Sequence, residues 1–73
     1  MHVHAHDFLW LANHPDELQR LYAGQWLAVV EDRIVAAGRD GRAVYREARR
    51  NHPLAEITLE VVTEDAHDLL SMA

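Results

Sequence analysis

Three histidines at alternate positions, His2, His4 and His6 in the opening stretch MHVHAHD, have the residue type and spacing best suited to metal chemistry. Neutral imidazole binds zinc, nickel and copper, and alternate side chains of an extended segment can point to one side. These histidines are the metal candidates of the chain. They precede the first predicted helix, however, where chain ends are usually poorly ordered, so we expect residues 1–6 to be a flexible His-rich terminus.

The stretch HVHAHD is similar to the HxHxDH ligand motif of metallo-β-lactamase-like hydrolases, but here the third histidine and the aspartate are transposed. Members of that superfamily also take metal ligands from distant loops of a much larger fold, which a chain of 73 residues cannot supply. We therefore predict no dedicated metal site and no cofactor.

Residues suited to catalysis are scarce in the rest of the chain. It has no cysteine and no lysine, and its single serine, Ser71, lies near the C-terminal end. A nucleophile paired with a base inside a protected site is hard to build from these residues. We predict that the protein is not an enzyme.

The length of the chain, 73 residues, allows a single small domain. A domain of this size buries only about 60% of the surface that its unfolded chain exposes, and without cysteine it has no disulfide to compensate. Such domains often gain the missing burial by assembling with another chain. No apolar run is long enough for a membrane span and the N-terminus lacks the pattern of a signal peptide, so we expect a cytoplasmic protein that contacts no membrane.

Charge is distributed unevenly along the chain. Twelve acidic residues against seven arginines give a net charge of −5, which argues against nucleic-acid binding. Residues 39–50 alone hold five arginines and two acids, a local net charge of +3. Arg42, Arg46 and Arg49 recur there at helical spacing. Such a stripe is either a solvated helix face or a docking surface for an acidic protein partner.

The N-terminal part of the chain has the pattern of an interrupted helix. Apolar residues recur at helical spacing in FLWLA and PDELQRLY, and Asp7 is the predicted N-cap. Pro15 lacks a backbone donor and disfavours helical geometry in the residue before it, so we predict a break near residues 13 and 14. Gly24 is predicted to end the second helical stretch.

The segment QWLAVVEDRIVAAG predicts an antiparallel hairpin in which Glu31 and Asp32 form a two-residue turn. In that register Ala28 pairs with Val35, and both faces of the hairpin are apolar. One face carries Leu27, Val29, Ile34 and Ala36, and the other carries Trp26, Ala28, Val30, Val35 and Ala37.

An ordinary two-layer domain needs only one apolar sheet face, so the second face of this hairpin requires a cover. The interrupted N-terminal helix offers few apolar residues for this purpose. We therefore predict a homodimer or larger assembly, or a complex with another protein, that buries the second face. The residues expected at the interface are Trp26, Ala28, Val30, Val35, Arg42, Arg46 and Arg49.

The rest of the chain predicts a further helix and a third strand. Asp40 is the expected N-cap of a helix that ends before His52 and Pro53. The alternation in EITLEVV indicates a half-buried strand, and a right-handed crossover through the helix makes it parallel to the second strand, with the strand order open. Residues 64–73 are expected to form a tail or short helix. The predicted fold is one α+β domain over residues 1–73, in the order α-β-β-α-β with a small three-stranded sheet.

In order and spacing, FLWLANHPDEL, YAGQWLAVVEDRIVAAG, the helix around residues 44–48 and the alternating last strand resemble the small prokaryotic domain of unknown function numbered 5678. The resemblance spans about Phe8 to Val62. It implies a helix, a hairpin, a helix and a strand, with no assigned activity and no catalytic residues. The chain departs from the family at the turn, where Glu31 and Asp32 replace an Asn-Gly type of pair, which leaves the turn geometry open.

Two classes of function follow. The first is a non-catalytic protein-interaction module or accessory subunit that assembles through its small sheet. The second is an antitoxin-like regulator, because a hairpin followed by a helix that opens with Asp-Gly is similar to the HicB type of antitoxin, which neutralises a toxin by covering its active surface. A small basic ribonuclease as partner would favour the second class.

Overall fold

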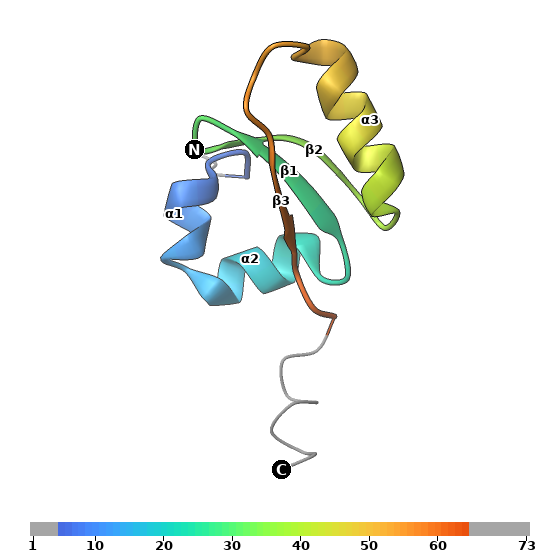
Figure 1. Ribbon diagram of the computed structural model, residues 1–73. Coiled ribbons are helices and arrows are strands. Elements are labelled where there is room, and N and C mark those ends of the chain that lie inside the picture. The colour runs from blue at the N-terminus through green and yellow to red at the C-terminus, as the bar shows by residue number, and fades with distance from the viewer. Residues whose placement is uncertain (1–4, 65–73) are drawn as a thin grey trace.

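The structure is a computed structural model, and it describes residues 5–64 of the chain. Over this range three helices and three strands confirm the predicted α+β fold, with the N-terminal helix divided into two (Figure 1). No helix in this range has the length and apolar character needed to cross a membrane. The elements are α1 (Phe8–Ala12), α2 (Pro15–Tyr22), β1 (Trp26–Val30), β2 (Arg33–Gly38), α3 (Gly41–Asn51) and β3 (Thr58–Val61).

The three strands form an antiparallel sheet in the order β2-β1-β3 (Figure 1). The central strand, β1, pairs with β2 through the hairpin and with β3 on its other side. Because both neighbours are antiparallel to β1, β2 and β3 run in the same direction, as the crossover argument predicted. They do not touch as a pair, however, and β3 forms one edge of the sheet.

The hairpin turn consists of Glu31 and Asp32, whose φ angles are both positive, at 53° and 67°. Two such residues in succession are typical of a type I′ turn, so the acidic pair adopts the geometry that Asn-Gly usually provides. The predicted register is correct only next to the turn. A β-bulge in the middle of the hairpin shifts it, and Ala28 pairs with Ala36 instead of Val35.

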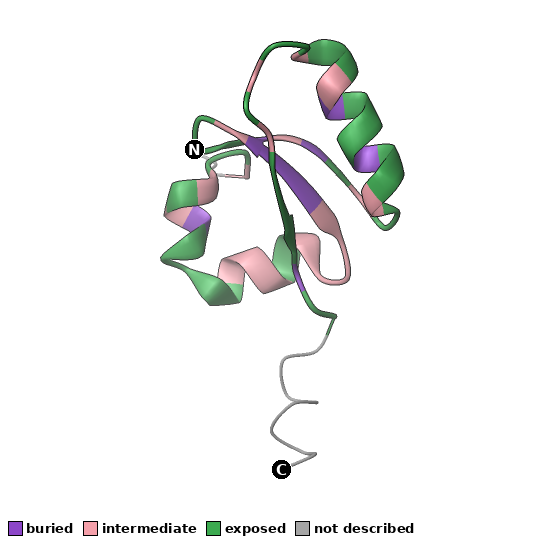
Figure 2. Ribbon diagram, in the orientation of Figure 1, coloured by how far each residue is buried: buried purple, intermediate pink, exposed green. Residues whose placement is uncertain are grey.

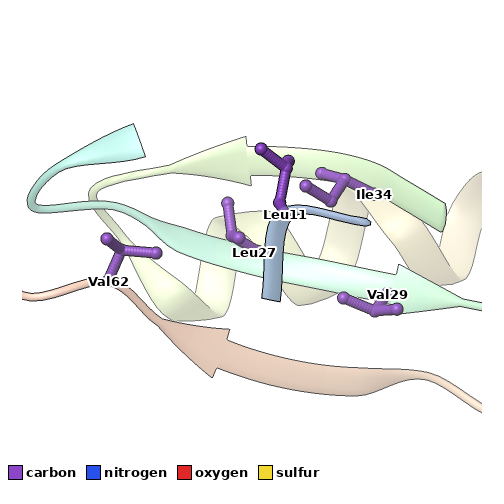
Figure 3. Packing of buried hydrophobic residues seen from close by; sticks show 5 residues of the cluster. All are labelled: Leu11, Leu27, Val29, Ile34 and Val62. Carbon is purple, nitrogen blue, oxygen red and sulfur yellow. The ribbon is translucent and has the colours of Figure 1, made fainter. Parts of the chain in front are cut away.

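One face of the sheet is covered by the N-terminal helices. Leu11 of α1 is fully buried against the strands, and side chains of α1 and α2 close the margin of this core. The expectation that these helices offer too little apolar surface to cover a face is therefore wrong. A helix of only five residues suffices because it directs Leu11 into the middle of the cluster. The buried residues on this face are Leu11, Leu27, Val29, Ile34 and Val62 (Figure 3).

The opposite face of the sheet is covered by α3. Val44 and Ala48 of the helix pack onto Ala28 and Ala36, and all four residues are buried. In Figure 2 the buried parts of α3, β1 and β2 are purple. The sequence pattern placed Ala36 on the other face, but the bulge turns it toward α3. The interface expected at Ala28 needs a correction, because the chain itself covers this residue and a second chain is not required to bury it.

Residues before α1 are tied to the rest of the domain. The carbonyl oxygen of His6 accepts a hydrogen bond from the N–H of Ile34 at 2.9 Å. The hydroxyl of Tyr22 donates to the carbonyl oxygen of Ala5. Ala5 and His6 therefore belong to the structured domain, although we expected a flexible terminus to extend through residue 6.

The predicted helix starts are confirmed by their caps. One carboxylate oxygen of Asp7, Oδ1, accepts a hydrogen bond from the N–H of Trp10 at 3.0 Å. Oδ1 of Asp40 accepts from the N–H of Arg42 at the same distance. These side chains satisfy donors that the first turn of a helix leaves without a backbone partner. The predicted break falls immediately before Pro15, which begins α2.

β3 is more exposed than its alternating sequence predicted. All four of its residues are exposed, including Leu59 at 37% and Val61 at 53%. The reason is that α3 packs mainly over β1 and β2. Val62, which directly follows β3, is buried under the N-terminal helices.

Burial raises the pKa of the Tyr22 phenol above its ordinary value of 10.0. The folded state thus favours the neutral phenol, so this contribution to stability is fully present below pH 10.0 and is lost as the pH rises through the raised pKa. The phenolate absorbance of the wild type and of the Tyr22→Phe variant is titrated with pH. The difference between the two curves is the signal of Tyr22, and its midpoint should lie above pH 10.0. A midpoint at or below that value would contradict the burial of this ring.

Candidate protein-docking groove

An open groove with a volume of about 930 Å³ lies between α3 and β3. It is called the α3–β3 groove below. Its lining combines apolar side chains with guanidinium groups, the two kinds of residue that the sequence singled out for an interface. The lining residues are Trp26, Asp40, Gly41, Arg42, Tyr45, Arg46, Arg49, Arg50 and Leu59.

The floor of the groove exists because α3 does not extend over the edge of the sheet. Leu59 of the edge strand stays 37% exposed beside the helix. Trp26, the first residue of β1, lies beside the first turn of α3. Gly41 opens that turn, and a Cβ atom at this position would lie only 3.0 Å from the Trp26 ring. The missing side chain at Gly41 therefore allows the indole to lie close against the helix.

Arginines form the rim of the groove along α3. Arg42, Arg46 and Arg50 recur at intervals of four residues, which places them on one side of the helix beside the apolar floor. All three are exposed, and none has a carboxylate partner within residues 5–64. A guanidinium group pairs with a carboxylate through two parallel hydrogen bonds. The rim is therefore suited to an anionic partner group.

Arg49 has a different role from its neighbours. Its guanidinium group donates to the carbonyl oxygens of Pro53 and Ala55, each at 2.9 Å, and to the Tyr45 hydroxyl at 3.0 Å. The guanidinium carbon also lies 5.4 Å from the centre of the Tyr45 ring. Arg49 thus holds the loop that leads from α3 to β3 and positions Tyr45 in the wall of the groove.

Arg49→Ala should destabilise the domain by about 1–2 kcal/mol, because the loop carbonyls lose their charged donor. For a domain of this size each kcal/mol lowers the melting temperature by about 4–8 °C. The matched control is Arg50→Ala, which removes an exposed guanidinium group from the same helix and should change stability by less than about 0.5 kcal/mol. Thermal unfolding followed by circular dichroism compares the two. Equal losses would show that the contacts of Arg49 do not hold the loop.

The structure brings together only part of the predicted interface. Trp26 and the three predicted arginines all line the α3–β3 groove. Ala28 is buried beneath α3, and the remaining two residues, Val30 and Val35, are half-buried elsewhere on the hairpin. Among the predicted interface residues the groove therefore groups only the tryptophan and the three arginines, and their contact with a partner stays a prediction.

Five lining residues were not among the predicted interface residues, namely Asp40, Gly41, Tyr45, Arg50 and Leu59. The sequence pattern assigns Tyr45 to the inner side of its helix and Leu59 to the buried side of its strand. Both residues line the groove because α3 packs mainly over β1 and β2 and leaves β3 largely uncovered. Arg50 could have been found, because it continues the four-residue spacing of Arg42 and Arg46.

The structure describes only one of the three N-terminal histidines, His6. Among residues 5–64 no group of three histidine, aspartate or glutamate residues is placed to hold a metal ion. His6 is exposed, whereas His2 and His4 lie outside the described residues, as does the predicted tail beyond residue 64. That MHVHAHD forms no dedicated metal site stays a prediction.

A divided N-terminal helix, a three-stranded antiparallel sheet and one covering helix define the protein as a small α+β domain. The model of the family of unknown function DUF5678 matches residues 17–63. The matched segment runs from α2 to just beyond β3 and covers more than half of the chain, so the protein belongs to this family. The resemblance seen in the sequence is thereby confirmed. No curated protein and no solved structure matches the chain.

Proposed function

We propose that the protein is a non-catalytic interaction module that binds an acidic, partly apolar segment of a partner protein in the α3–β3 groove. The observation that supports this most strongly is the pairing of an apolar floor, formed by Trp26 and Leu59, with an exposed arginine rim. Tryptophan and arginine are the residues most often responsible for binding energy at protein interfaces. Exposed apolar surface with a polar margin is typical of such sites.

Charge selects the kind of partner. Residues 39–50 carry a local charge of +3 within a chain of net charge −5, so the remaining residues sum to −8. An acidic segment can place its carboxylates on the rim while its apolar side chains cover Trp26 and Leu59. A nucleic acid presents a continuous phosphate backbone, which the acidic remainder of the chain would repel. A protein partner is therefore favoured over a nucleic acid.

A different protein is also favoured over a second copy of this chain. Two copies that met groove to groove would bring two arginine rims together, and like charges at an interface are unfavourable. The sequence-based reason for a homodimer was an uncovered hairpin face, and the chain covers both faces itself. We therefore propose the role of an accessory subunit within a complex of different chains. Light scattering of the pure protein at high concentration should then give the mass of the monomer.

An antitoxin-like role has less support. The partner expected for such a regulator is a small basic ribonuclease, and a basic surface would be repelled by Arg42, Arg46 and Arg50. The acidic remainder of the chain could still meet a basic partner, but the groove would then have no part in binding. The two roles therefore differ in the charge of the partner and in the surface used.

The experiment that tests the proposal is the selection of binding peptides from a random-sequence display library against the full chain. Acidic residues interspersed with apolar ones should be enriched, and binding should weaken as the salt concentration rises. Enrichment of basic peptides would favour the antitoxin-like role. A selection that yields no peptide dependent on the arginine rim would contradict the proposal.

A further inference from the structure

The outer edge of β3 has backbone groups whose direction follows from the pairing with β1. The N–H of Val62 donates to the carbonyl oxygen of Gln25 at 2.9 Å, so the polar backbone groups of Val62 face β1. Along an antiparallel strand these groups alternate between the two sides. Glu60 therefore also bonds to β1, whereas the N–H and C=O groups of Leu59 and Val61 face outward. This edge is a row of hydrogen-bonding groups with no strand beside it among residues 5–64.

The same two residues carry the exposed apolar side chains of the strand. Leu59 pairs with Ala28 and Val61 pairs with Trp26, and directly paired residues project to the same face of a sheet. Both side chains therefore lie on the face that carries α3, where Leu59 lines the groove. An open backbone edge and an exposed apolar surface thus coincide at Leu59 and Val61.

We propose that the partner segment binds in extended form, as a fourth strand hydrogen-bonded to the edge of β3. Its apolar side chains, at alternate positions, lie beside Leu59 and Val61, and its carboxylates reach the arginine rim. This inference rests on the proposed function and adds the way in which the partner is held. Backbone hydrogen bonds contribute affinity that is independent of sequence, whereas side-chain contacts provide the specificity. A strand edge left open in this way is a ready template for another chain.

The occupant of this edge is a segment of a different protein rather than a second β3. In the symmetric antiparallel register that sets Leu59 of one copy opposite Val61 of the other, the pairing of two β3 strands is centred on Glu60. The Glu60 side chains of the two copies would then lie directly opposite each other, and like charges in that position destabilise the pairing. An acidic segment with alternating apolar residues avoids this conflict, because it can align its apolar positions with Leu59 and Val61 in other registers.

The test measures the affinity of the full chain for the synthetic peptide acetyl-DELTVTLED-amide by calorimetry. Val61→Pro removes an N–H that faces outward, so the pairing with β1 is kept while the edge is blocked. It should weaken binding by about tenfold or more, whereas Val61→Ala, which keeps the N–H, should weaken it by less than about threefold. Circular dichroism checks that both variants keep the fold.

A second measurement leaves the protein unchanged and alters the peptide. Two versions of the peptide carry N-methyl groups at alternate residues. In one version the methyl groups replace the N–H hydrogens that face β3, and in the other they replace those that face away from it. One version should bind like the parent peptide and the other about tenfold or more weakly. Equal binding of both versions would overturn the strand addition but not the proposed function. Strand addition alone would also be overturned if the wild-type chain did not bind this peptide but acidic peptides were still enriched in the library selection. If the chain neither bound this peptide nor enriched acidic peptides, the proposed function would be overturned as well.

Discussion

Replacing Leu11 with alanine should lower the free energy of unfolding by about 2–5 kcal/mol, the range for a large apolar residue removed from a packed core. Leu11 is fully buried, with 0% of its surface accessible to solvent. It points from α1 into the core cluster on this face of the sheet (Figure 3). A domain of this size rarely has more than about 3–5 kcal/mol of stability in total. We therefore expect the variant to be largely unfolded at 37 °C, as measured by chemical denaturation of both proteins.

The matched control is Leu9→Ala, the same substitution two residues away in α1. Leu9 is 56% exposed, and its replacement should cost less than about 0.5 kcal/mol. The comparison is informative because the family match begins only at residue 17, after α1 has ended. Similar small effects for both variants would show that α1 is not part of the core and that the sheet face beneath it is covered in another way.

Reversing two charges of the rim, with Arg42→Glu and Arg46→Glu together, should weaken the binding of an acidic peptide by about tenfold or more. Each substitution removes an attraction and adds a repulsion next to the groove floor. Because both residues are exposed, the fold should be retained, with a change in stability below about 0.5 kcal/mol per site. Calorimetric titration with peptides selected from the display library measures the loss of affinity.

The control for this charge reversal is a second double variant with the same change in net charge. Arg20→Glu and Arg33→Glu alter exposed arginines that do not line the groove. If the position of the charge matters, this variant should bind the peptides nearly as well as the wild type. Equal losses in both double variants would mean that total charge, rather than the rim, determines binding.

Local features of the fold were predictable because the determinants lie close together in the sequence. Asp7 and Asp40 cap their helices through side-chain oxygens, and Pro15 sets the break between α1 and α2. The turn at Glu31 and Asp32 was predicted in position, although its positive φ angles could not be read from acidic residues. These elements depend on interactions over at most four residues, which sequence patterns record directly.

Features that depend on distant residues were not predictable in the same way. The bulge that moves Ala36 to the other face is a property of the paired strands, and the alternation of apolar residues does not show it. The position of β3 outside β1 also could not be deduced, because the crossover rule gives its direction but not its neighbour. The α3–β3 groove follows from that position. Sequence reasoning could therefore name Trp26 and the arginines but not the floor at Leu59.

The most direct test of the docking surface uses the two tryptophans of the chain, which lie on opposite faces of the sheet. Trp26 lines the α3–β3 groove. Trp10 belongs to α1, packs against the core on the opposite face and stacks on His14, with ring centres 3.7 Å apart. In nuclear magnetic resonance spectra of the full chain, titration with a library-selected acidic peptide should shift the indole N–H signal of Trp26 and leave that of Trp10 in place. A shift of Trp10 alone, or binding that moves neither signal, would contradict the proposal that the α3–β3 groove is the docking surface.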